Sequence, residues 1–414
     1  MVAGLLVLGI GATPVTVASY DVRTPHYDVS TDISEPFAQV VGEHMESIYG
    51  AYALRFQGYE LKVHERFQVK VFAQKEDYYR AVPEQLRGST GAFVSSLKLL
   101  AAYKEGRSDE DVFRTLYHEG FHQFMFSCIA RNAPLWVNEG LAEYFSEASW
   151  NGSGFTTGQV PPMRLKLVQD ALREGSHIPL QDLMAMKSED WLSNVRAQQT
   201  AASLQYCEAW SVVHFMVHAE GGRYRPRLLG YLKLISDGTD EQEAFRQSFG
   251  EDMEGLERAW TAYVMKLVPG PEYLCRRNLE ALCQLIIELY GDPREFKGLP
   301  DLRRSLLNPR SHWRVEFSYG ETIDSRDTKK VKALFKCPFD RTSSAISYPV
   351  LEDPETGLPV LACAHHKGVV LLGKFIPTAD GGYRVEVQQL VAATLPPELR
   401  EALQRASGGV RRHN

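Results

Sequence analysis

Residues 108–147 read SDEDVFRTLYHEGFHQFMFSCIARNAPLWVNEGLAEYFSE, and within them His118, Glu119 and His122 form the pattern H-E-x-x-H. On a helix, histidines four residues apart leave the same face about one turn apart. Two neutral imidazoles held in this way can bind one divalent metal ion. Glu119 would then point sideways from the pair, where it can take a proton from a metal-bound water.

The residues around this pattern predict a buried helix. Ser108 followed by Asp111 resembles a capping box, and the three acids of the first turn suit the positive end of the helix dipole. From Val112 to Ile129 apolar residues occur nearly all round the helix, which is typical of burial. Ionisable groups at such positions need partners, because an unpaired buried polar group costs about 2–7 kcal/mol.

A second helix is predicted at Leu135–Glu147, after a turn at residues 131–133 and with Pro134 at its first position. It carries Glu139 and Glu143, again four residues apart on one face. Two histidines and one glutamate that leave a fourth position for water are the ligands of a catalytic zinc site rather than a structural one. The expected cofactor is therefore Zn²⁺.

The segments HEGFH and LWVNEGLAEYF together resemble the gluzincin metallopeptidases, and the N-E-G-x-A wording around Glu139 is similar to their aminopeptidase branch. Residues 27–267 also resemble an uncharacterised bacterial family of metallopeptidase-like proteins, a domain-of-unknown-function family. The resemblance implies a zincin-like fold with His118, His122 and Glu139 as zinc ligands. It makes Glu119 the general base.

Two further roles follow from the resemblance. Glu143, four residues after the third ligand, would hydrogen-bond the first histidine ligand and fix its tautomer. The alternative for Glu143 is a surface glutamate on an amphipathic helix. Tyr206 lies at about the distance where related enzymes have an oxyanion-stabilising tyrosine, although buried tyrosines with a satisfied hydroxyl are common. His214 and His218 are expected to be ordinary helix residues.

The chain departs from the aminopeptidase pattern at residues 90–94. Aminopeptidases carry there a glutamate that binds the free amine of the substrate, whereas this chain reads Thr-Gly-Ala-Phe-Val. Aminopeptidase specificity is therefore not supported. The strand after Gly91 can still bind a peptide through the edge of a sheet.

With 414 residues, the chain is long enough for two or three domains. The patterns predict an α+β fold: residues 19–268 form the metallopeptidase domain, with a mixed sheet, the active-site helix and a helical C-terminal subdomain. Residues 272–414 form a small module of one helix followed by mainly β structure. The expected strands are 27–32, 67–72, one or two within 92–103, 313–318, 331–335, 369–375 and 383–387. The further expected helices are one that begins at residue 35 and others at 75–82, 206–218, 245–267 and 275–290.

The first 18 residues are uncharged and apolar, which favours an export signal and a periplasmic or extracellular protein. No lysine or arginine precedes the apolar run, so the alternative is a first strand at Val15–Ala18 in a cytoplasmic protein. Membrane association is expected only if this segment stays as an uncleaved anchor.

The net charge of −6, without a large basic block, argues against a nucleic-acid partner. The expected partner is a peptide or protein substrate, and the sequence leaves the oligomeric state open. In the C-terminal module, Cys337 and the segment from Cys363 to His366 favour a disulfide or buried thiols over a metal site, because one cysteine on the first side leaves the ligand set incomplete.

These observations predict a zinc-dependent peptidase in which Glu119 activates the attacking water. Two alternatives stay open. One is an inactive metal-binding protein that serves recognition, and the other is a metal-dependent hydrolase of a non-peptide bond, since the ligand set does not itself choose the substrate.

Overall fold

The computed structural model describes residues 19–59, 61, 65–150, 154–196, 200–310, 312–316, 322–339, 346–364, 369–378 and 381–408. The predicted export signal and the alternative strand at Val15–Ala18 lie outside these residues. The fold is mixed α+β, as predicted. It divides into two compact units, one made of the described residues up to Ala133 with Ile235–Gly238, the other of Pro134–Leu234 with the described residues from Thr239 on. The predicted domain boundary at Pro269–Pro271 falls inside the second unit and stays a prediction.

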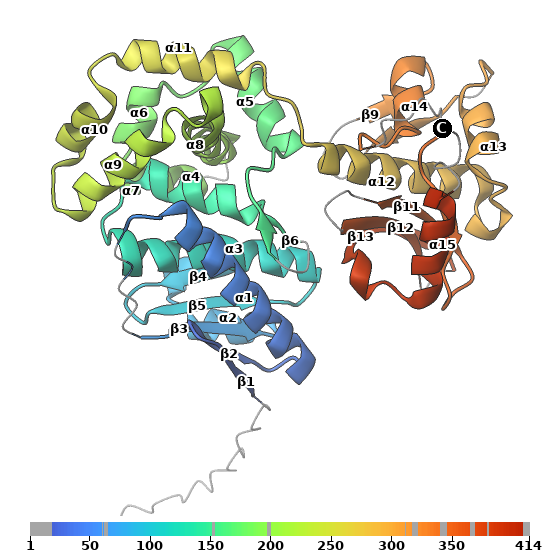
Figure 1. Ribbon diagram of the computed structural model, residues 1–414, viewed down its shortest axis with the longest axis horizontal. Helices are drawn as coiled ribbons and strands as arrows, with labels where there is room; N and C mark the ends of the chain where they lie inside the picture. Colours follow the sequence, from blue (N-terminus) through green and yellow to red (C-terminus); the bar gives the residue numbers. More distant parts are fainter. Residues whose placement is uncertain are drawn as a thin grey trace, which may run out of the picture. The chain divides into compact units, whose positions relative to one another are not determined.

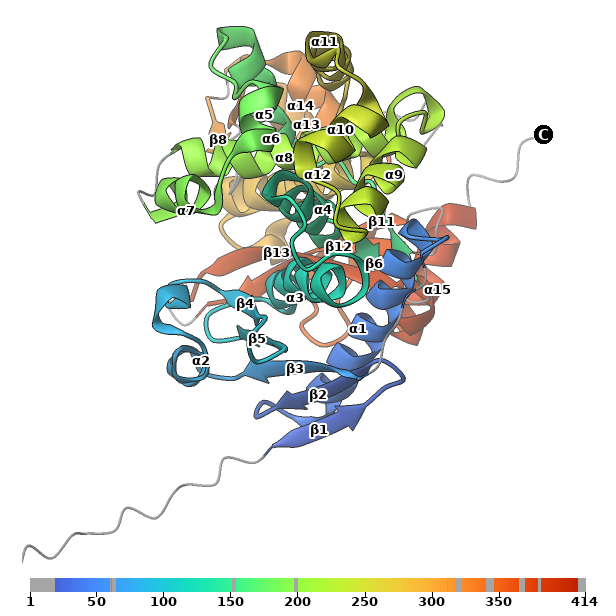
Figure 2. The ribbon, with the colours of Figure 1, turned by 90° about the vertical axis from the view of Figure 1, so that its left-hand side faces the viewer.

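A five-stranded mixed sheet forms the base of the first unit, with the order β1-β2-β3-β5-β4 from one edge to the other, as Figure 2 shows. The two edge strands run antiparallel to their neighbours, and the three central strands are parallel. The strands are β1 (Tyr20–Arg23), β2 (Tyr27–Thr31), β3 (Phe67–Phe72), β4 (Gly91–Val94) and β5 (Leu99–Tyr103). The predicted strands up to residue 103 are therefore confirmed.

Helices cover both faces of this sheet because side chains alternate along each strand. Leu100 of β5 packs toward α3, whereas Ala101 and Tyr103 join a cluster with residues of α2 on the other face. The helices of this unit are α1 (Glu35–Arg55), α2 (Lys75–Ala81), the short turn η1 (Glu84–Leu86), α3 (Asp109–Phe124) and its π-helical continuation η2 (Met125–Ile129), with α1 and α3 seen in Figure 1.

Gly120 owes its place in α3 to close packing by α1. A Cβ atom on Gly120 would lie 2.9 Å from Cε of Met45 and 3.3 Å from the hydroxyl of Tyr52. Contacts this short leave no room for even one methyl group without movement of these side chains. The cost of a glycine inside a helix, about 1 kcal/mol against alanine, is offset by this approach.

The second unit begins with a group of helices around α8. They are α4 (Leu135–Ser146), α5 (Pro162–Glu174), α6 (Leu180–Ala185), α7 (Ser188–Arg196), α8 (Thr200–His218), η3 (Ala219–Gly221), α9 (Arg225–Ser236), α10 (Glu241–Phe249) and α11 (Met253–Val264), with a small hairpin of β6 (Ser149–Trp150) and β7 (Phe155–Thr156). The prediction of one helical segment over 245–267 is wrong. Gly250, with φ +87°, ends α10, and Asp252 caps the start of α11 through the amide of Gly255.

Residues from 271 onward contain a four-stranded antiparallel sheet with the order β10-β11-β12-β13. Leu361 and Leu371 face a core shared with α12, and Val360 and Val370 face a second core shared with α15. The elements are α12 (Pro271–Tyr290), η4 (Pro293–Glu295), α13 (Leu299–Leu306), β8 (Arg314–Glu316), β9 (Thr322–Asp324), α14 (Thr328–Leu334), β10 (Val350–Glu352), β11 (Pro359–Ala364), β12 (Val369–Pro377), β13 (Tyr383–Val391), η5 (Ala392–Thr394) and α15 (Pro397–Gly408).

The predicted strand at 331–335 is wrong, because these residues belong to α14 and its C-terminal cap. Asp327 caps the helix by accepting a hydrogen bond from the amide of Lys330. Val331 and Leu334, three residues apart, place two buried side chains on one helical face. Of the predicted strand over 313–318, the structure has β8 from Arg314 to Glu316, and residues 317 and 318 lie outside the described ones.

Among the described residues, no helix combines the length and the apolar character that a bilayer crossing requires.

Gly140, next to the predicted ligand Glu139, lets α4 lie directly against α8. A Cβ atom at position 140 would be 2.4 Å from the backbone oxygen of Ala209 and 2.7 Å from a methyl group of Val213. Backbone atoms cannot turn aside as a long side chain can. The two helices therefore approach this closely only because residue 140 has no side chain.

We expect Gly140→Ala to lower the free energy of unfolding by about 1–3 kcal/mol, the usual cost of overpacking. Gly50→Ala is the matched control, since Gly50 lies on an exposed face of α1, where an added Cβ atom would meet no other atom within 4 Å. That control should gain up to about 1 kcal/mol from helix propensity. Urea titrations of both variants test the prediction, and equal effects at the two positions would contradict it.

Candidate metal centre and active site

Helix α3 holds the predicted histidine pair in the expected geometry. Its N-terminus is fixed by Ser108, whose Oγ accepts a hydrogen bond of 3.1 Å from the amide of Asp111. One helical turn separates His118 from His122, and their Nε2 atoms lie 3.1 Å apart. The two rings are close to perpendicular, at 83°. Both nitrogens thus point to the same small volume.

Glu139 completes the predicted ligand set. One ligand atom from each of His118, His122 and Glu139 can be chosen so that all three lie within 4.8 Å of one another. All three residues are partly exposed, so solvent can reach the group. Two imidazole nitrogens and one carboxylate oxygen suit zinc, and imidazole also suits several other transition metals. The donor set therefore fits a metal ion without identifying it.

Glu119 has a partner that its sequence position did not indicate. Its Oε2 accepts a hydrogen bond of 2.8 Å from the backbone amide of Phe93, which lies in the edge strand β4. The carboxylate of Glu119 is thereby held at the edge of the sheet. It lies beside β4, which falls within residues 90–94, where the sequence departs from the aminopeptidase pattern. Only the three-dimensional packing of α3 on β4 brings these two groups together.

Glu143 is buried, so its interpretation as a surface glutamate is wrong. Its Oε2 forms an ion pair with Arg164 of α5 and accepts a hydrogen bond from Ser146. Arg164 also contacts Glu147 at 3.1 Å. Burial alone would lower the pKa of Arg164, but the carboxylates of Glu143 and Glu147 raise it above its ordinary value. No sequence pattern indicated this arginine, and a link from Glu143 to His118 stays a prediction.

Tyr206 lies in the first half of α8, partly exposed, with its ring edge-on to Trp191 at 5.2 Å between centroids. It precedes Ala209, the residue that touches Gly140 of α4, by about one helical turn. Tyr206 therefore belongs to the part of α8 that lies against the glutamate-bearing helix. Its role toward a reacting group remains a prediction.

His214 makes the contacts of a buried core residue, whereas His218, at the C-terminal end of α8, is exposed. In His214, Nδ1 lies 2.7 Å from the hydroxyl of Tyr263 and Nε2 lies 3.2 Å from the carbonyl oxygen of Gly158. Nε2 of His218 lies 3.0 Å from the hydroxyl of Tyr144. Burial lowers the pKa of His214 to about 3, which keeps its ring neutral at neutral pH. That the two are ordinary helix residues stays a prediction.

Residues 112–235 match a family whose description reads "Protein of unknown function (DUF1570)". The match runs from α3 into α9 and contains all six predicted site residues, but it covers less than a third of the chain. It agrees with the predicted likeness to an uncharacterised family, and it names no activity. Comparison with the curated proteins gave no match.

Glu208, two residues after Tyr206, is a buried acid whose charge state should affect how the stability of the protein depends on pH. Both of its oxygens lie 3.1 Å from the amide nitrogen of Ile178. Burial raises the pKa of Glu208 to about 8, against an ordinary value of 4.5. The folded chain therefore keeps this proton over a pH range in which the unfolded chain has lost it. Stability from this group is complete below pH 4.5 and falls as the pH rises toward 8.

We expect Glu208→Gln to match the wild type in stability near pH 4 and to exceed it increasingly up to pH 8. The difference should level off above pH 8 at a few kcal/mol, since one pKa unit corresponds to about 1.4 kcal/mol. Glutamine keeps an acceptor for the Ile178 amide, so packing is preserved. Unfolding free energies measured across this range test the prediction, and a pH-independent difference would disprove it.

Proposed function

We propose that the chain is a zinc-dependent peptidase whose site is formed by His118, His122, Glu139 and Glu119. The observation that carries this proposal is the convergence of two imidazole nitrogens and a carboxylate within 4.8 Å, next to an acid on the same helix. Such a set of three protein ligands leaves a position for water. A zinc ion there would lower the pKa of a water molecule and polarise a carbonyl group.

Glu119 is the proposed general base. It takes a proton from the water that attacks the peptide carbonyl carbon, and it then delivers that proton to the amide nitrogen as the C–N bond breaks. The carboxylic acid formed gives its own proton to the released amine, so the products are a carboxylate and an ammonium group and both protons of the water are accounted for. The hydrogen bond from Phe93 supports this role, because it holds one carboxylate oxygen in place and leaves the other as a candidate proton acceptor.

The edge strand β4 is the proposed peptide-binding element. It pairs with β5 on one side only within the described sheet, and Phe93 places its amide at Glu119. An extended substrate that adds to this edge would lie next to the general base. Tyr206 is the proposed donor to the oxyanion, and Glu143, held by Arg164, is the proposed hydrogen-bond partner of His118.

We expect Glu119→Gln to lower cleavage of a mixed peptide library by about 10²–10⁴-fold, the usual contribution of a general base. Metal content should not change, because the three ligands remain. Glutamine can still accept the hydrogen bond from Phe93, so the local structure is preserved. Cleavage is followed by mass spectrometry, which also reports the bonds that are cut.

Glu110→Gln is the matched control, since Glu110 lies exposed in the first turn of the same helix. Its cleavage rate should equal that of the wild type. Bound zinc without any Glu119-dependent cleavage of peptides would contradict the proposal and favour a recognition protein. Cleavage of ester or glycosidic substrates alone would favour a hydrolase of a non-peptide bond. Absence of metal at His118, His122 and Glu139 after soaking with zinc would contradict the peptidase proposal and both of these alternatives.

For Tyr206→Phe we expect a loss of about 10²–10³-fold in kcat with little change in KM, since a donor to the oxyanion acts mainly in the transition state. Tyr263→Phe removes a hydroxyl that bonds His214 and should leave kcat unchanged. Steady-state kinetics on one peptide found in the library test this. A loss confined to stability, or equal losses in both variants, would identify Tyr206 as a packing residue.

A further inference from the structure

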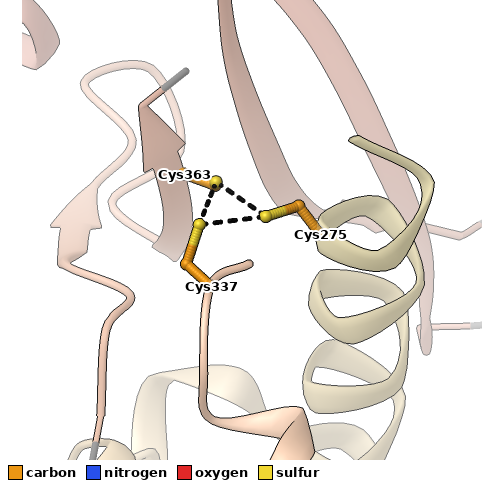
Figure 3. Close-up of side chains that lie close together, drawn as sticks. All are labelled: Cys275, Cys337 and Cys363. Carbon is orange, nitrogen blue, oxygen red and sulfur yellow. Dashed lines mark hydrogen bonds between the residues drawn. The ribbon is translucent and has the colours of Figure 1, made fainter. Parts of the chain in front are cut away.

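Three cysteines from separate parts of the C-terminal sequence meet at one point, as Figure 3 shows. Cys275 lies in the first turns of α12, Cys337 follows α14, and Cys363 lies in β11. Their sulfur atoms are 3.0 Å apart for Cys275 and Cys337, 2.9 Å for Cys337 and Cys363, and 3.1 Å for Cys275 and Cys363. All three side chains are buried.

For Cys337 and Cys363 the sequence favoured a disulfide or buried thiols, and the structure has buried free thiols. A third cysteine, Cys275, lies about as close to each of them as they lie to each other. A disulfide joins only two sulfurs, at about 2.05 Å, and would leave the third aside. Sequence reasoning missed Cys275 because it lies 62 residues before Cys337, on the buried face of an amphipathic helix.

Packing of apolar thiols does not account for the arrangement either. Non-bonded heavy atoms attract each other best at about 3.5–4.0 Å, and these sulfurs lie closer than that. Cys283 gives the comparison, because it is a fully buried cysteine two turns further along α12. Among the described residues it belongs to no group of metal-ligating type, whereas the other three do.

The cluster also has polar neighbours inside an otherwise apolar core. The hydroxyl of Tyr348 lies 3.9 Å from Sγ of Cys275. Asn278 lies one turn after Cys275. Its side-chain Nδ2 donates a hydrogen bond of 3.0 Å to the carbonyl oxygen of Lys336 and lies 3.1 Å from the Tyr348 hydroxyl. Asn278 thus fixes the backbone immediately before Cys337. Such groups orient the ligands of a metal and offset the charge of thiolates.

We propose that Cys275, Cys337 and Cys363 bind a thiophilic metal ion, with zinc as the first choice. Thiolate ligands select such ions, and a tetrahedral Zn–S distance of about 2.3 Å places sulfurs about 3.8 Å apart. The triangle needs to widen by less than about 1 Å to accept it. Binding releases the thiol protons to solvent and involves no change of oxidation state. Water would take the fourth position.

The ion would act as a structural clamp. It would join α12, the segment after α14 and the strand β11, three elements that contribute to one core. Metal-binding free energy then becomes folding free energy for this part of the chain. This site is separate from the histidine site and does not depend on its activity.

The test measures zinc per chain in the full-length protein, expressed with zinc and purified under a reducing agent. We expect about two equivalents in the wild type and about one in His118→Ala/His122→Ala. Cys275→Ser/Cys337→Ser should also retain about one, whereas Cys283→Ala should retain two. Unchanged zinc in the Cys275/Cys337 variant would overturn the proposal, and unchanged zinc in the histidine variant would instead count against the proposed function.

A second measurement covers the case in which the cysteine variant does not fold. Cobalt is loaded into His118→Ala/His122→Ala, which keeps all three thiols. We expect a thiolate-to-cobalt charge-transfer absorption, and thiols that a sulfhydryl reagent labels only after a chelator is added. No such absorption, or a disulfide between any two of the three in protein prepared with zinc, would overturn the proposal.

Discussion

The structure around α3 depends on two imidazole nitrogens that lie 3.1 Å apart. The rest of this helix is packed mainly among apolar residues. Both histidine side chains are only partly exposed, so a shared proton or a shared ligand would offset the hydration that their apolar surroundings exclude. Two glycines next to the donors permit close packing of the helices that carry them. Gly120 lets α1 pack directly against α3, and Gly140 lets α4 pack directly against α8.

Local sequence patterns predicted the parts that depend on neighbours in the chain. The cap at Ser108, the turn at 131–133 and the spacing of the histidines all follow from short-range rules, and the structure has them. The strand prediction at 331–335 was wrong because a helix and a strand explain a short apolar run equally well. Asp327, a capping residue just before it, was the signal that could have decided the case.

The parts that sequence could not predict are contacts between distant segments. The amide of Phe93 at Glu119, the ion pair of Arg164 with Glu143, and the addition of Cys275 to the other two cysteines all join residues that no spacing rule connects. The resemblance to known peptidases indicated the candidate ligands but not the strand that contacts Glu119. Departures from the family pattern at 90–94 lie at this strand, where tertiary structure alone determines the partners.

The hydrogen bond between Phe93 and Glu119 has a consequence for solution behaviour as well. An edge strand with open amides is a template for pairing with other chains, and proteins commonly blunt such edges with charged side chains. Here a carboxylate occupies one such amide of β4. Glu119 therefore blunts the edge of β4 at this one amide, and loss of the hydrogen bond would open the amide to pairing with another chain or, as proposed above, with a peptide.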